Sequence, residues 1–148
     1  MKSDNQQGMS LIVQVITRIT VGLILLYGIY IVMHGHLSPG GGFAGGVIIA
    51  LSFVHMVIAF GRKEAYKIIA SPVISMFESI GALAFLAIGL LCFVGGNFFY
   101  DWLPKGEPFS FFSGGTIILS NIAISFKVAF GLFAIFMVLI MIDRGEGE

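Results

Sequence analysis

Four long apolar runs constrain the fold of this 148-residue chain more than any other feature. They cover about residues 11–33, 43–60, 73–96 and 121–142. Each is close to the roughly 20 residues that an α-helix needs to cross a hydrocarbon core of about 30 Å. A spanning β-strand needs only about 10 residues and alternates apolar with polar positions, which these runs do not do. We therefore predict an all-α integral membrane protein with four transmembrane helices in one domain, residues 1–148.

The composition agrees with this prediction and narrows the possible functions. Hydrophobic residues make up 57% of the chain and charged residues 11%, which is outside the range of a soluble domain. The formal net charge is zero, without the basic stripe that nucleic-acid binding needs. The single cysteine, Cys92, excludes an internal disulfide and is expected to be a small buried apolar residue. The first run is too long for a signal peptide and contains Arg18, so we expect it to be retained.

The connectors predict the orientation in the membrane. With four crossings, both termini and the connector between the second and third runs lie on one side. That side carries most of the basic connector residues: Lys2, Arg62, Lys63, Lys67 and Arg144. The opposite side offers only Lys105, so the positive-inside rule predicts cytoplasmic termini and a multi-pass protein of the plasma membrane. Residues Asn97–Pro104, "NFFYDWLP", are expected to form an aromatic anchor at the outer interface, and Ser71-Pro72 to begin the third helix.

Three of the ionisable residues inside the runs are expected to share one depth. A charged side chain at the centre of a span costs about 2.5–3.5 kcal/mol, so each needs a partner or water. Counting 1.5 Å per residue from the expected helix ends, Arg18, Glu78 and His55 lie about 8–10 Å from the cytoplasmic edge. We therefore expect an Arg18–Glu78 ion pair that His55 joins by a hydrogen bond, with either a structural role or a role in proton relay.

Lys127 is expected on the other side of the membrane. It lies about 9 Å below the expected outer edge, near the depth of Tyr27 and without an acidic residue of this chain at that depth. Three roles stay open: carrying a proton, pairing with a carboxylate of another protein chain, or structural pairing. The candidates for an ion path or for intramembrane charges are thus Lys127, Glu78, Arg18, His55 and Tyr27. Three nearby polar residues, Ser120, Asn121 and Ser125, are expected to cap the helix or to hydrogen-bond across helices.

Between the first two runs lies "HGHLSPGGGFAGG", residues 34–46. A phosphate-binding loop is excluded because no Lys-Ser/Thr pair follows the glycines. No metal site is predicted, because His34 and His36 have no third ligand apart from Asp101 or Glu107 on the other outer connector.

The structural reading of this segment is a tight turn with close helix packing. Pro39 and Gly40–Gly42 predict a sharp reversal of the chain. Small residues then recur four apart at 41 and 45, 42 and 46, and 46 and 50, which is typical of helices that a neighbouring helix approaches closely.

The same segment resembles a family hallmark. "GHLSPGGGFAGG" is similar to Gly-His-x-x-Pro-Gly-Gly-Gly-Phe-x-Gly-Gly in the MnhB (MrpB) component of the Mrp-type multisubunit Na+/H+ antiporters and in the related component of archaeal membrane-bound hydrogenases. The matching residues are Gly35, His36, Pro39, Gly40, Gly41, Gly42, Phe43, Gly45 and Gly46. Many bacterial members have an aspartate where this chain has Asn121, and "SFKVAFG", residues 125–131, looks more like the archaeal or respiratory-complex branch.

The resemblance implies a noncatalytic membrane subunit of a multisubunit Na+/H+ antiport module. It implies a host that is either a free-standing antiporter or a membrane-bound, hydrogenase-like respiratory complex. It also implies other small and large antiporter-like subunits as partners, against which the glycine motif would pack, and no cofactor in this chain. Two alternatives stay open: an autonomous four-helix exporter acting as a homodimer, for which a central glutamate would be expected where Arg18 stands, and a purely structural spacer.

Overall fold

The computed structural model describes residues 9–61, 71–94, 96, 103 and 113–142 of the chain. This part contains four helices, which are α1 (Leu11–Met33), α2 (Gly41–Phe60), α4 (Ser71–Val94) and α5 (Thr116–Ile142). All four contain a segment long and apolar enough to cross a membrane, and the described residues form no strand. The prediction of an all-helical membrane protein with four spans is confirmed.

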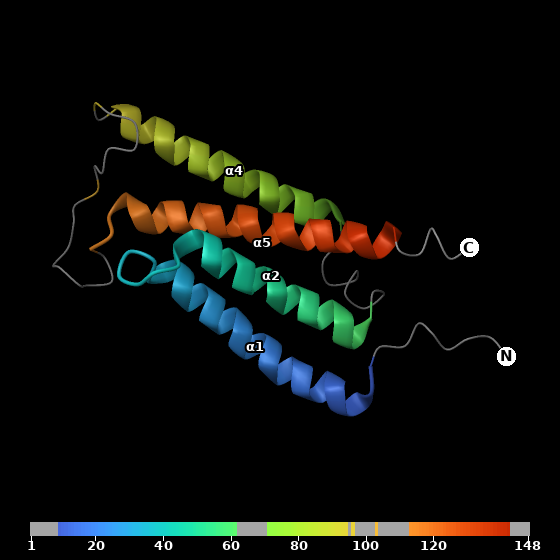
Figure 1. Cartoon of the computed structure of the whole chain (residues 1–148). Helices are drawn as coiled ribbons and strands as arrows, with labels where there is room; N and C mark the ends of the chain where they lie inside the picture. Colours follow the sequence, from blue (N-terminus) through green and yellow to red (C-terminus); the bar gives the residue numbers. More distant parts are fainter. Residues whose placement is uncertain (1–8, 62–70, 95, 97–102, 104–112, 143–148) are drawn as a thin grey trace.

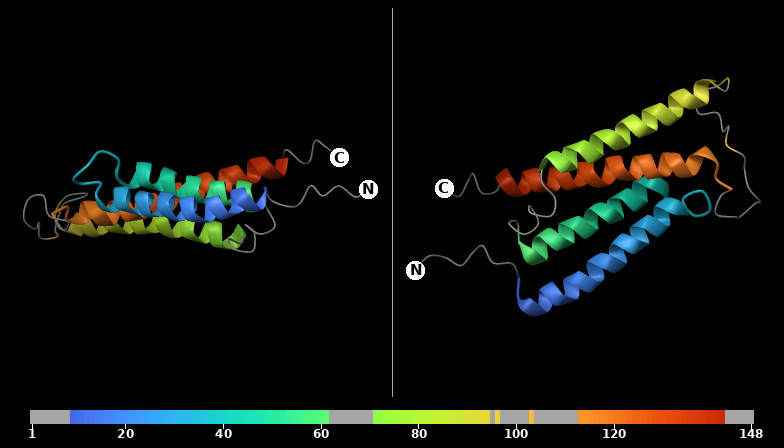
Figure 2. Two further views of the ribbon diagram at one scale, coloured as in Figure 1. Left: turned by 90° about the horizontal axis from the view of Figure 1, so that it is seen from below. Right: turned by 180° about the vertical axis from the view of Figure 1, so that it is seen from behind.

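The helices lie side by side in the order α4, α5, α2, α1 (Figures 1 and 2). The main packing contacts are between α1 and α2, α2 and α5, and α4 and α5. Helices α1 and α4 therefore occupy opposite edges and leave many large apolar side chains exposed, such as Leu11, Leu26, Leu83 and Val94. Such surfaces suit a membrane, where lipid or another membrane helix covers them.

A hydrophobic core joins the three helices α2, α4 and α5. Its buried centre consists of Val57, Ile74, Phe133 and Met137. The ring of Phe53 packs on that of Phe133 with the centroids 5.6 Å apart. Cys92 on α4 is fully buried, as the sequence predicts.

The bounds of the helices lie within two residues of the expected spans except at the start of α5. Helix α1 has the predicted bounds, and Pro72 lies in the first turn of α4 as expected. Helix α5 begins at Thr116, after a turn in which Gly115 has φ 50°, and so includes Ser120 and Asn121. The expected boundary at 121 is wrong because these polar residues lie within the helix. The Ser125 hydroxyl donates to the carbonyl of Ile122 in its own helix at 2.7 Å, not across helices.

Several predictions concern residues outside the described part of the chain. These residues are the basic ones used for orientation (Lys2, Arg62, Lys63, Lys67, Lys105 and Arg144), most of the expected aromatic anchor (Phe98, Phe99, Tyr100 and Trp102), and Asp101 and Glu107. The cytoplasmic position of the termini accordingly stays a prediction.

Candidate functional site

An ion pair joins α4 to α5. The ammonium Nζ of Lys127 donates to Oε1 of Glu78 at 2.5 Å. Glycines permit this close approach. A Cβ added at Gly81, one turn after Glu78, would lie 2.7 Å from the backbone nitrogen of Lys127, and one at Gly131 would lie 3.6 Å from the Glu78 carboxylate oxygen. The chain thus supplies a partner for both charges.

This pairing corrects two expectations. Glu78 pairs with Lys127 instead of Arg18, because α1 and α4 lie at opposite edges of the layer. Lys127 does have an acidic neighbour in this chain. Since α5 begins at Thr116, Lys127 lies about 16 Å along the helix, deeper than expected, and Glu78 lies about 10 Å along α4 from the other end of the layer (Figure 1).

The pair remains partly open to the surroundings. The side chain of Lys127 is 49% exposed and that of Glu78 is 30% exposed. A charge pair that deep in two spanning helices needs either water or a polar neighbour on its open side. The open side of the Glu78–Lys127 pair is therefore the candidate site for contact with an ion or with another protein.

Arg18 has an aromatic partner. Its guanidinium carbon lies 5.5 Å from the ring centroid of Phe60, the last residue of α2. This cation–π contact places the charge where α1 begins and α2 ends, close to one end of the layer (Figure 1). Arg18 therefore fits an anchoring role near a membrane boundary.

His55 belongs to a small polar site between α1 and α2. Its Nε2 lies 3.3 Å from the hydroxyl oxygen of Thr20, whose hydrogen is directed to the carbonyl of Ile16 at 3.1 Å or Thr17 at 3.2 Å. Thr20 and His55 thus share a hydrogen bond whose direction depends on the tautomer of the imidazole. Thr17 beside it is buried. The expected hydrogen bond from His55 to the Arg18–Glu78 pair is replaced by this local one.

Tyr27 lies on an exposed part of α1. Its ring is stacked on that of Tyr30 with centroids 6.5 Å apart, and Tyr30 in turn stacks on His34 at 4.1 Å. Tyr27 thus begins an aromatic series that leads to the glycine motif, and this series, like the ion pair, remains a candidate for function.

The glycine motif forms the turn between α1 and α2 and the first turns of α2. Gly40 and Gly41 have φ of 140° and 65°, a backbone conformation that favours glycine. The backbone of Gly35 is pressed against that of Gly41 and against the Asn121 side chain, leaving no room for a Cβ. His36 packs against Gly114, where an added Cβ would lie 2.8 Å from the imidazole ring.

The glycines of α2 pack against helices of the same chain. An added Cβ at Gly42 would collide with the backbone of Asn121, and one at Gly46 would lie 3.0 Å from the Ser125 carbonyl oxygen, both on α5. One at Gly45 would lie 2.9 Å from the carbonyl oxygen of Gly28 on α1. The close packing predicted from the sequence is confirmed. The expectation that it is made with other subunits is wrong for Gly42, Gly45 and Gly46, because α1 and α5 already cover these glycines. Phe43 is 65% exposed.

A family model described as a domain related to the MnhB subunit of Na+/H+ antiporter matches residues 12–134, which include α2, α4, the glycine motif and most of α1 and α5. The chain belongs to this family.

Relatives of this MnhB-family chain are found in archaea and bacteria. An uncharacterized protein of Methanocaldococcus jannaschii is 34% identical over 117 residues, which are 74% of this chain and 44% of the relative. The Staphylococcus saprophyticus protein that carries the name antiporter subunit mnhB2 is 33% identical over 92 residues, which are 61% of this chain and 64% of the relative. The chain therefore spans less than two thirds of the length of either relative.

The MnhB-family chain is also similar to a solved structure. The structure of the membrane-bound sulfane sulfur reductase, an archaeal respiratory membrane complex, contains a chain with 29% identity and a TM-score of 0.71. The match covers 90% of this chain and 61% of that chain. The four-helix fold of this chain is thus also found in a respiratory membrane complex.

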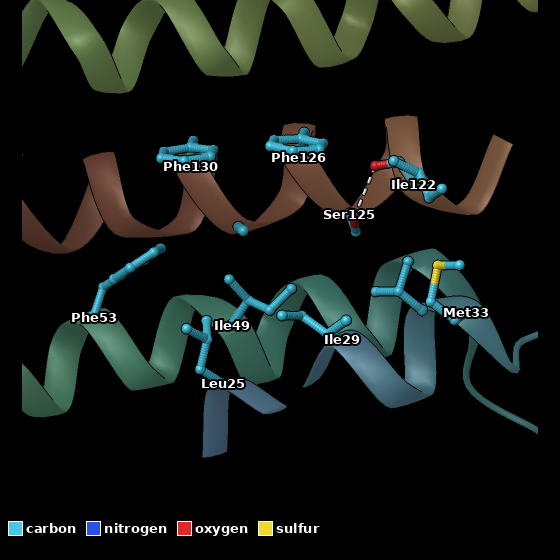
Figure 3. Close-up of a pocket in the computed structure, with 11 residues that line it drawn as sticks. Leu25, Ile29, Met33, Ile49, Phe53, Ile122, Ser125, Phe126 and Phe130 are labelled. Carbon is cyan, nitrogen blue, oxygen red and sulfur yellow. Dashed lines mark hydrogen bonds between the residues drawn. The ribbon is translucent and has the colours of Figure 1, made fainter. Parts of the chain in front are cut away.

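An apolar groove of about 370 Å³ lies between α1, α2 and α5 of the MnhB-family chain (Figure 3). Its walls include Ile29 of α1, Phe53 of α2, and Phe126 and Phe130 of α5. Sequence analysis missed this groove because its walls are ordinary apolar residues of the spans, and no motif marks them. Within the described part of the chain, no three His, Cys, Asp or Glu residues are grouped so that they could bind a metal ion.

Proposed function

We propose that this chain is a noncatalytic subunit of a multisubunit Na+/H+ antiport module in the plasma membrane. The family match over residues 12–134 and the relative named as an antiporter component support this proposal. Two hosts fit: a free-standing antiporter, and a respiratory complex like the one to which the similar solved chain belongs. In either host the transported ions are Na+ and H+, any redox chemistry is carried by other subunits, and this chain needs no cofactor of its own.

The observation that carries a role in transport is the Glu78–Lys127 pair. An ionisable residue inside a membrane span is costly and is a functional candidate by default. In our proposal the carboxylate and the ammonium exchange a proton, or separate when a cation approaches. Because four helices in one layer do not enclose a channel, the ion path lies on the open side of this pair, against another protein of the module. His55 and the Tyr27 series are secondary candidates, and Arg18 is an anchor.

The experiment that tests this function compares membranes with and without the chain. The complete set of subunits is produced in a host that lacks its own sodium antiporters, and inverted vesicles are assayed for collapse of a preformed pH gradient on addition of Na+. We expect a Na+-dependent proton flux with the chain, and its loss when this chain alone is omitted. An equal flux from both membranes would contradict the proposal.

Purification through a tag on this chain separates the proposal from the autonomous exporter. A member of the module brings several other membrane proteins with it, whereas an exporter is recovered as a homodimer. Fusion reporters at the two ends test the orientation: green fluorescent protein is expected to fluoresce, and alkaline phosphatase to stay inactive, at both termini.

A further inference from the structure

The Glu78–Lys127 pair also bears on where a neighbouring membrane protein docks. An ammonium group has three N–H donors, and Glu78 accepts one of them. The Lys127 side chain is 49% exposed and that of Glu78 is 30% exposed, so the pair is open to a neighbour on one side. Lipid tails offer no hydrogen-bond acceptor for the remaining donors.

Lys127 lies too deep to reach the headgroups from its place in α5. Snorkelling serves lysines close to helix ends, whereas Lys127 lies about 16 Å along a helix of 27 residues. The open side of the pair is therefore within the hydrocarbon region. A neighbour that covers it there has to be protein or protein-bound water.

The pair and the apolar groove occupy different faces of the layer. Successive residues of a helix are about 100° apart, so Ser125 and Ala129, which line the groove, lie about 160° around α5 from Lys127. Two and three turns farther along α5, Ile135 and Val138 lie near the same stripe as Lys127 and are 58% and 53% exposed. Gly131, one turn after Lys127, contacts the Glu78 side chain, since a Cβ added there would lie 3.6 Å from Oε1 of Glu78. This stripe, defined by Lys127, Gly131, Ile135 and Val138, is called the α5 stripe below.

We propose that the α5 stripe is the docking surface for a membrane helix of a different protein in the same complex, and that this helix presents a carboxylate to Lys127. The complementarity rests on the N–H donors of Lys127 that remain after its bond to Glu78, which a carboxylate accepts most strongly. The exposed apolar residues of the stripe, Ile135 and Val138, suit packing of that helix. The inference rests on the proposed function only in that the chain is part of a larger membrane assembly.

Photo-cross-linking in the intact complex tests the surface. The photoreactive residue p-benzoylphenylalanine replaces Ile135 in one variant and Phe126, on the groove face, in a matched control. We expect the Ile135 variant to cross-link to one specific membrane protein of the complex, with at least a tenfold greater yield than the Phe126 variant. Absence of that cross-link while tag purification still recovers the complex overturns the docking surface alone, whereas recovery of the chain without other subunits overturns the proposed function as well.

Substitution of the charges tests the chemistry of the partner. The double variant Glu78→Gln with Lys127→Met removes both charges of the pair, so neither is left without its partner, and Lys127→Arg keeps the donors. We expect the double variant to recover about tenfold less of the cross-linked partner, the effect of one lost charge-assisted hydrogen bond, and Lys127→Arg to recover a wild-type amount. Wild-type recovery by the double variant would show that the partner has no carboxylate for Lys127 and would overturn the proposal.

Discussion

Replacing Gly42 with alanine tests the packing of α2 on α5. The added Cβ would collide with the backbone carbonyl oxygen of Asn121 and lie 2.9 Å from both the Cα of Asn121 and the Cβ of Ile124. Carbon atoms in good contact are about 3.5–4.0 Å apart, so the two helices have to separate by up to about 1 Å. Overpacking of this kind costs about 1–3 kcal/mol, while alanine recovers up to about 1 kcal/mol in helix propensity. We expect a net loss of about 1–2 kcal/mol.

Thermal unfolding in detergent measures this loss, with Gly22→Ala as the matched control. No heavy atom lies within 4 Å of a Cβ added at Gly22, so that variant gains propensity without a clash. A thiol-reactive fluorophore follows unfolding through Cys92, the single cysteine, which is fully buried. The melting temperature of Gly42→Ala is expected about 2–8 °C below wild type, and that of Gly22→Ala at or above it. If Gly42→Ala melts as high as the control, the packing argument is refuted.

Three further predictions concern the other candidate residues. Thr20→Val removes the hydroxyl that His55 contacts and is expected to cost about 1 kcal/mol of stability; an unchanged melting temperature speaks against that hydrogen bond. In the assembled complex Cys92 is expected to react with a maleimide only after denaturation, and fast labelling of the native protein is the contrary result. Phe60→Leu is expected to lower the free energy of unfolding by about 0.5–1 kcal/mol in the wild-type chain and to leave it unchanged in an Arg18→Met background. A double-mutant cycle that shows no coupling between the two positions refutes the cation–π contact.

The number and type of the spans are predictable from the sequence because hydrophobic length is a local property. The start of α5 is not, since Ser120 and Asn121 resemble a polar boundary when they are viewed alone. What accommodates Asn121 inside the helix is a tertiary contact with the glycines at 35 and 41, and no window of the α5 sequence contains those residues.

The sequence predicts which charged residues lie inside the spans, but not which of them form a pair. Counting residues gives a depth for each charge, but it does not say which helices are neighbours. Arg18 and Glu78 have similar expected depths and yet lie on helices at opposite edges, while Lys127 reaches Glu78 from the adjacent helix. The same holds for the glycine motif. The spacing of its small residues predicts close packing, but only the order of the helices in the layer shows which helices are packed.

The most direct test of the account is the effect of Glu78→Gln on antiport by the complete complex. Glutamine keeps the size of the side chain and can still accept from Lys127, but it cannot carry the charge or exchange the proton. We predict at least a roughly tenfold lower Na+-dependent proton flux in inverted vesicles, with the other subunits recovered in wild-type amounts. A wild-type flux from a fully assembled Glu78→Gln complex would contradict the account and would leave this chain a structural spacer.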